Sequence, residues 1–169
     1  MGLNAESKKL SDVDVSPYDA IFMPGGLAPM VDMPEHPLLK QVIKETYERQ
    51  AIVGAVCHGP VSLLNVRLSD GSYLLAGKSI SSFTNEEEHY AKADVPFELE
   101  TALTKQGAIF HKTSPWQSFS IADGNLVTRQ NPASAKGVAE KMIAIESCMN
   151  YLQCSFVILL PWSRCVKWA

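Results

Sequence analysis

Two short and almost wholly apolar runs, each closed by a turn that contains glycine, constrain the fold of this chain most strongly. Residues 19–26 (DAIFMPGG) and 51–56 (AIVGAV) carry too few polar side chains for strands with one solvent-facing side. Both are therefore predicted to be strands buried on both faces. Between them, residues 34–50 place apolar side chains at helical spacing among charged ones, which predicts an amphipathic helix. Short connections between strand, helix and strand predict parallel strands with a right-handed crossover.

The same alternation of strands and helices continues through the rest of the chain. The elements predicted there are one or two helical turns at 61–66, a short strand at 79–83, helices at 85–93 and 97–106, strands at 108–110 and 126–128, and a helix at 132–146. The Asp-Gly-Asn run at 123–125 predicts a turn before the last of these strands. We therefore expect a single α/β sandwich.

Composition limits the class of protein. A chain of 169 residues suits one domain, and 46% apolar with 20% charged residues suits a globular core. The 15 Lys and Arg residues and 18 Asp and Glu residues are scattered and leave a net charge of −3, so no nucleic-acid partner is expected. The apolar run at 154–162 is shorter than the ~20 residues that span a bilayer. The start of the chain has no apolar segment typical of a secretion signal. We therefore expect no membrane partner and a cytoplasmic protein, with the nucleus as a second compartment.

The cysteines and histidines predict neither a disulfide framework nor a metal site. Cys57 stands alone, and the other three cysteines fall within residues 148–165. Their spacings differ from paired C-x-x-C motifs and from Cys/His zinc patterns, and the four histidines are dispersed. We expect no bound metal.

Cys57 stands where a reactive group is expected in a parallel sheet. It directly follows the second buried run and begins the sequence CHGP, which predicts a tight turn resembling a nucleophile elbow. A helix N-terminus and His58 beside it would lower the pKa of the thiol. The N–H of His58 could bind an oxyanion, and Gly25 and Gly26 could bring a second N–H to the same point.

Each of these features also has a plain structural interpretation. A single cysteine after an apolar run can be a small buried hydrophobe, and two glycines after a strand can form an ordinary turn. Carboxylates at Glu86, Glu87 and Glu88 can simply occupy a solvated helix start, where the helix dipole favours them.

Several motifs, taken together and in order, identify the chain as a member of the ThiJ/PfpI superfamily. They are YDAIFMPGG, AVCHGP, SFTNEEE, VPFELE, PW and DGNLVTRQNPASA. The branch that they resemble most contains the glutathione-independent glyoxalase III enzymes and small heat-shock chaperones. The resemblance implies a flavodoxin-like three-layer α/β/α sandwich with a mainly parallel sheet.

The resemblance also implies a Cys-His-acid site. Cys57 corresponds to the nucleophile, and His58 is the histidine beside it. The acid falls at Glu88 in the best alignment, with Glu86 and Glu87 as alternatives. Gly25 and Gly26 match the oxyanion loop of the family.

The function implied is conversion of methylglyoxal, a small dicarbonyl, to D-lactate through the Cys57 nucleophile, a lyase reaction without glutathione or any cofactor. The resemblance also implies a homodimer. Two alternatives are a non-catalytic stress chaperone, supported by apolar surface, and a cysteine-based sensor of oxidative stress.

The sequence departs from the family pattern at several points. A further strand, helix and strand at the start of family members, including a glutamate that contacts the nucleophilic sulfur, have no counterpart, so the N-terminal units are expected to be missing. Leu27 and Ala28 stand where His-Gly is common, and Arg129 replaces a glycine. We expect a partial domain at 1–146, a divergent tail at 147–169, an open sheet edge that makes the chain marginally stable or dimeric, and impaired activity.

Overall fold

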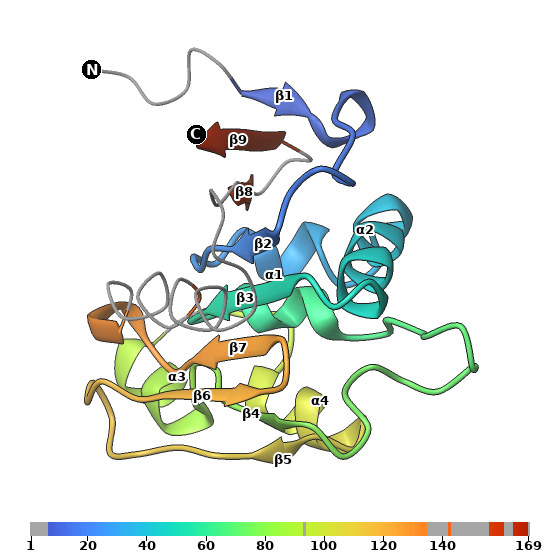
Figure 1. Ribbon diagram of the computed structural model, residues 1–169. Coiled ribbons are helices and arrows are strands. Elements are labelled where there is room, and N and C mark those ends of the chain that lie inside the picture. Colours follow the sequence, from blue (N-terminus) through green and yellow to red (C-terminus); the bar gives the residue numbers. More distant parts are fainter. Residues whose placement is uncertain (1–6, 93, 135–141, 143–155, 161–163, 169) are drawn as a thin grey trace.

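The computed structural model describes residues 7–92, 94–134, 142, 156–160 and 164–168 (Figure 1). The strands are β1 (Lys8–Lys9), β2 (Ala20–Met23), β3 (Ile52–Val56), β4 (Ser79–Ile80), β5 (Ile109–Phe110), β6 (Ser120–Asp123), β7 (Leu126–Arg129), β8 (Phe156–Leu160) and β9 (Arg164–Trp168). The α-helices are α1 (Pro29–Asp32), α2 (Pro37–Glu48), α3 (Asn85–Ala91) and α4 (Leu99–Lys105). Short 3₁₀ helices are η1 (Leu10–Asp12), η2 (Gly59–Leu63) and η3 (Pro132–Ser134).

The strand, helix and strand predicted around the two apolar runs are present. β2 and β3 pair in parallel, with Ala20 opposite Ile52, and α2 lies between them in the chain. Pro37 occupies the start of α2, and Nδ1 of His36 accepts a hydrogen bond from the N–H of Leu39 at 3.2 Å. This cap satisfies one of the backbone donors that every helix start leaves free.

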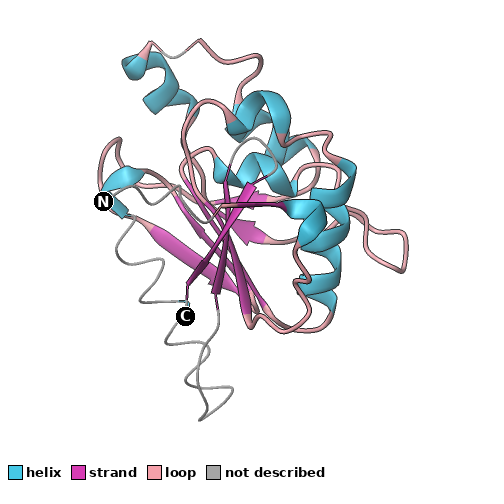
Figure 2. Cartoon of the chain, turned by 90° about the horizontal axis from the view of Figure 1, so that it is seen from above, coloured by secondary structure: helices cyan, strands magenta, loops and turns pink. Residues whose placement is uncertain are grey.

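A seven-stranded sheet with the order β1-β9-β8-β2-β3-β7-β6 forms the centre of the described structure. Four consecutive strands, β8, β2, β3 and β7, run parallel, and the pairings β1–β9, β9–β8 and β7–β6 are antiparallel. Most of the drawn helices lie along one side of the strand layer (Figure 2). The expected α/β fold with a mainly parallel sheet is therefore confirmed.

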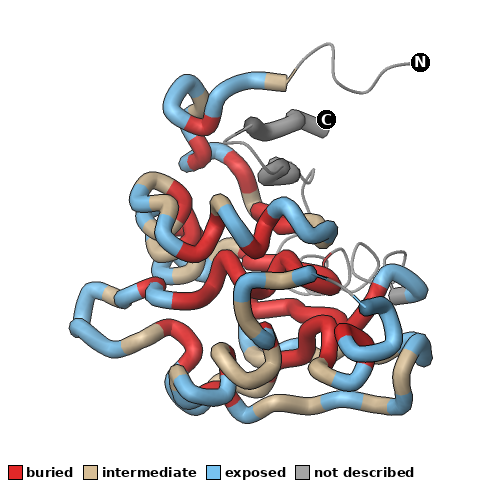
Figure 3. Tube along the Cα trace, turned by 180° about the vertical axis from the view of Figure 1, so that it is seen from behind, coloured by how far each residue is buried: buried red, intermediate tan, exposed pale blue. Residues whose placement is uncertain are grey.

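The alternation of side chains along the inner strands builds a core on each face of the sheet. Ile21 and Val53 belong to the larger core, which includes the buried side of α2. Ala20 and Ile52 point to the other face and pack in a second cluster that contains Met142. Buried segments run through the middle of the molecule as a result (Figure 3).

Two predicted helices differ from the expectation in their type or in their range. The helical turns expected at 61–66 are the 3₁₀ helix η2, which begins at Gly59. The helix expected at 132–146 begins as η3, and the rest of that range, apart from Met142, lies outside the described residues. In the described ranges, every helix is too short or too polar to cross a bilayer.

Strand β6 is absent from the sequence prediction. It forms an antiparallel hairpin with β7 around the predicted turn at 123–125. Its residues are half-buried or exposed, and it lies at the outer edge of the sheet. An edge strand with little burial lacks the apolar run by which a buried strand is recognised, so the signal was weak.

The expectation of an open edge beside β2 is wrong. β8, from the segment expected as a divergent tail, pairs in parallel with β2, and β9 and β1 extend the sheet beyond it. The apolar run at 156–160 was long enough for a strand, but its period alone could not separate a strand from an apolar patch. A domain boundary at residue 146 stays a prediction.

The packing of α2 on the sheet gives a prediction for stability. Ile43 is fully buried in the larger core, so Ile43→Ala should lower the free energy of unfolding by about 2–5 kcal/mol. Gln41→Ala, on the exposed side of the same helix, should change it by less than about 0.5 kcal/mol. Urea unfolding followed by circular dichroism measures both values, and equal losses would show that α2 does not contribute to the core in this way.

Candidate active site

Cys57 lies in a sharp turn between β3 and η2. Its φ of 60° falls in the left-handed region, which non-glycine residues rarely adopt and which is frequent at functional sites. Its N–H donates to the carbonyl of Arg129 at 3.0 Å, and its own carbonyl accepts from the N–H of Phe83 at 2.9 Å. The elbow predicted from the sequence is therefore present, and neighbouring segments hold it from both sides.

Two glycines allow the chain to pass close to this turn. A Cβ at Gly25 would lie 2.6 Å from the Cβ of Cys57, and one at Gly59 would lie 2.2 Å from the carbonyl oxygen of Met23. Both separations are shorter than real Cβ atoms show, so any larger residue would displace the elbow. Gly25 thus contributes space beside the thiol.

Two backbone N–H groups point at the sulfur of Cys57. They belong to Gly26 and His58, the residues from which the sequence predicted oxyanion donors. Gly26 has a φ of 107°, in the left-handed region that favours glycine. An oxygen formed on a carbon bound to this sulfur would lie close to the same donors.

The side chains of Cys57, His58 and Glu88 form one chain of hydrogen bonds. Nδ1 of His58 lies 3.2 Å from the sulfur, and its Nε2 lies 2.7 Å from Oε1 of Glu88. A carboxylate only accepts, so Nε2 carries the proton that it donates to Glu88, and Nδ1 is left as the acceptor for the thiol. All three residues are buried, and the imidazole also stacks on Phe83 with ring centres 4.6 Å apart.

The structure distinguishes among the three consecutive glutamates that the sequence left open. Glu88 faces His58, whereas Glu86 is exposed to solvent. Glu87 is buried, but its carboxylate accepts hydrogen bonds from Thr84 and from other segments. Successive residues of a helix point about 100° apart, so the start of α3 at Asn85 decides which carboxylate reaches the histidine.

The expected low pKa of Cys57 is wrong. Burial of the thiol, its largest influence, raises the pKa to about 11. The N–H groups of Gly26 and His58 lower it, but the negative charges of Glu87 and Glu88 add to the increase. The expected helix dipole is also weak here, because η2 is only five residues of 3₁₀ helix. Cys57 is therefore a protonated thiol at neutral pH, and its sulfur becomes a nucleophile when a base takes the proton.

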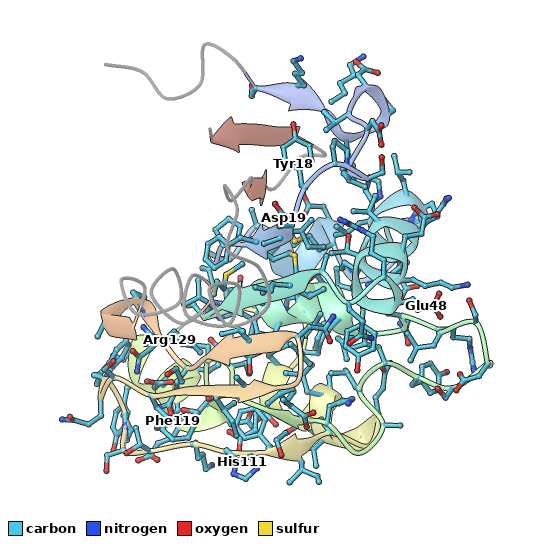
Figure 4. The ribbon with its side chains drawn as sticks, in the orientation of Figure 1. Tyr18, Asp19, Glu48, His111, Phe119 and Arg129 are labelled. Atoms are coloured by element: carbon cyan, nitrogen blue, oxygen red, sulfur yellow. The ribbon has the colours of Figure 1, made fainter. Side chains whose placement is uncertain are left out.

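The residues that depart from the family pattern surround this site. Leu27, next to Gly26, is about half exposed. Arg129 is buried at the end of β7, and its carbonyl receives the N–H of Cys57 (Figure 4). Phe83 and Trp116, which pack edge to face at 5.7 Å, belong to quoted motifs but were given no role from sequence. Their aromatic character was the available signal, and only the fold brings them together.

In the described part of the chain, no three His, Cys, Asp or Glu side chains are grouped so that they could hold a metal ion.

Comparison with known proteins gives a consistent set of relatives. The model of the DJ-1/PfpI family matches residues 4–145. Glyoxalase 3 of Candida albicans is 33% identical over 149 residues, which cover 83% of this chain and 63% of that protein. Glutathione-independent glyoxalase HSP31 of Saccharomyces cerevisiae is 33% identical over 147 residues, which cover 82% of this chain and 62% of that protein.

A solved structure, that of glyoxalase III from Candida albicans, superposes with a TM-score of 0.74 at 32% identity. The match covers 80% of this chain and 60% of that one. This chain therefore spans a little less than two thirds of the length of these relatives.

The buried thiol gives a prediction for pH dependence. Only the thiolate reacts with iodoacetamide, and burial holds the proton on Cys57 up to about pH 11. Alkylation of Cys57 should therefore be slow at about pH 7 and rise roughly tenfold per pH unit to beyond about pH 9. Mass spectrometry of the peptide with Cys57 measures the rate, and the same chain unfolded in urea, where a thiol titrates near ~8.5, is the control. A folded-state rate that levels off below about pH 8 would contradict the burial effect.

Proposed function

The chain belongs to the DJ-1/PfpI family, and on this basis we propose that it converts methylglyoxal to D-lactate without glutathione, with Cys57 as the nucleophile. The observation that supports this most is the series of hydrogen bonds that joins Cys57, His58 and Glu88. The backbone N–H groups of Gly26 and His58 also bind the thiol of Cys57. The glyoxalase names of relatives that are about one third identical give the substrate class.

The first step is addition of the thiol to the aldehyde carbon of methylglyoxal. As the sulfur forms its bond to carbon, the thiol proton passes to Nδ1 of His58, 3.2 Å away. Glu88 stabilises the positive imidazole from the other side. The aldehyde oxygen becomes an oxyanion, which the N–H groups of Gly26 and His58 can hold until the imidazolium of His58 gives it the proton. This forms the hemithioacetal and leaves the imidazole neutral, ready to act as a base.

The second step moves hydrogen within the bound substrate. His58 removes the proton from the former aldehyde carbon, which gives an enediol, and a proton returns to the neighbouring carbon. The former aldehyde carbon is thereby oxidised to a thioester and the former ketone carbon is reduced to an alcohol. Water then cleaves the thioester, which releases lactate and restores the thiol. One methylglyoxal and one water give one lactate, so no outside oxidant, reductant or cofactor is needed.

The alternatives inferred from the sequence have less support. A sensor cysteine needs an accessible thiolate, whereas Cys57 is buried and its pKa is raised to about 11. The chaperone hypothesis rested on exposed apolar surface, partly from residues 156–160, and these residues form β8, which pairs with β2 inside the sheet. Homodimer formation stays a prediction from the family resemblance.

The proposal is tested by D-lactate formation from methylglyoxal without glutathione, measured with a D-lactate-specific dehydrogenase. Cys57→Ala should abolish turnover, because no other group forms the thioester. Glu88→Gln should lower kcat by about 10²-fold, because the positive imidazole loses its carboxylate partner.

Glu86→Gln is the matched control, since it removes the same charge from an exposed position two residues earlier on the same helix. Its activity should stay within about twofold of the parent chain. No D-lactate from the parent chain, or full activity of Cys57→Ala, would overturn the proposed function.

A further inference from the structure

Glu87 is a fully buried carboxylate to which the proposed reaction gives no part. Its Oε1 accepts hydrogen bonds from the N–H of Trp116 at 2.9 Å, from Nε2 of Gln130 at 3.1 Å and from Nδ2 of Asn131 at 2.8 Å. Its Oε2 accepts from the N–H and the hydroxyl of Thr84, both at 3.1 Å. All five donors are neutral groups, so the carboxylate of Glu87 is held by hydrogen bonds from uncharged partners.

These donors come from three segments that are far apart in the sequence. Thr84 caps the start of α3, Trp116 lies in the loop before β6, and Gln130 and Asn131 follow β7. A buried carboxylate must keep its donors because it has no water to replace them. The three segments are therefore held in a fixed relation around Glu87.

Each of the three segments contacts the proposed active site. The first turn of α3 carries Glu88, whose carboxylate binds His58. The ring of Trp116 packs on Phe83, and Phe83 stacks on the imidazole of His58. The carbonyl of Arg129, at the end of β7 directly before Gln130, receives the N–H of Cys57.

The backbone of Trp116 supports a role for Glu87 in holding the loop before β6. Its φ is 64°, in the left-handed region that a bulky aromatic residue rarely adopts. Such a conformation persists only where surrounding contacts impose it, and the hydrogen bond from its N–H to Glu87 is one of them. About half of the Trp116 side chain remains exposed, so burial of the ring alone does not fix the loop.

We propose that Glu87 is a positioning residue of this site, which sets the hydrogen bond between His58 and Glu88 by fixing the three segments that surround the imidazole. The proposal rests on the proposed function for its kinetic consequence. Its structural consequence, the state of the His58–Glu88 hydrogen bond, can be measured without any turnover.

The variant Glu87→Gln keeps the size of the side chain but points an NH₂ group at donors. We expect kcat to fall about tenfold or more while KM stays within about threefold, since the substrate does not touch Glu87. In a Glu88→Gln background, Glu87→Gln should cause little further loss, because the contact through which it acts is already weakened. Equal losses of kcat in both backgrounds would show a general effect on the fold and would overturn the proposal.

Proton NMR gives the second measurement. The Nε2 proton of His58, donated to a carboxylate oxygen 2.7 Å away, should give a resonance downfield of the amide region. Glu88→Gln should remove it and Glu87→Gln should shift or remove it, whereas the exposed-site control Glu86→Gln should leave it unchanged. An unchanged resonance in folded Glu87→Gln would overturn the proposal.

This design separates a failure of the proposed function from a failure of the proposal for Glu87. If the parent chain forms no D-lactate, the proposed function fails while the resonance still tests the role of Glu87. If Glu87→Gln does not fold, Asn131→Ala, which removes one donor and leaves the carboxylate, should shift the same resonance away from its position in the parent chain. A native resonance in Asn131→Ala and retained kcat would then overturn the proposal.

Discussion

The left-handed backbone of Cys57 is the constraint around which the described site is arranged. A residue with a φ of 60° needs contacts that hold it, and here the carbonyl of Arg129 and the N–H of Phe83 bind its two peptide groups. Gly25 and Gly59 leave the room that this turn requires on either side. The elbow in turn directs the thiol toward His58 and toward the N–H of Gly26. The contacts of the thiol therefore depend on the left-handed backbone of Cys57.

Burial has opposite effects on the two ends of the hydrogen-bonded series. It keeps the thiol of Cys57 protonated, because a thiolate would lose its hydration and face the charges of Glu87 and Glu88. It also strengthens the hydrogen bond from His58 to Glu88, since no water competes for the carboxylate. In the proposed reaction, the thiol reacts only when a substrate carbonyl is bound and its proton moves to the imidazole. This arrangement suits a catalytic thiol better than a thiol that senses oxidants.

The sequence predicted the largely buried strands β2 and β3 and missed β6, β8 and β9. β2 and β3 are recognisable because both faces are covered, so nearly every position is apolar. β6 lies at an edge, where exposed positions interrupt the pattern, and β8 and β9 come from a segment in which composition alone did not indicate strands. Pairing with β2 is a contact across more than a hundred residues, which no local pattern can specify.

The sequence by itself determined the parts of the site that are local. Cys57 and His58 are adjacent, and glycines at 25 and 26 close an apolar strand, so the elbow and its donors follow from short-range sterics and strand burial. The tertiary structure decided which carboxylate meets the imidazole, because the helical phase of α3 turns Glu88 toward His58 and Glu87 toward other segments. It also decided the pKa of the thiol, because burial depends on every segment that packs around Cys57, and sequence neighbours supply only a few of those contacts.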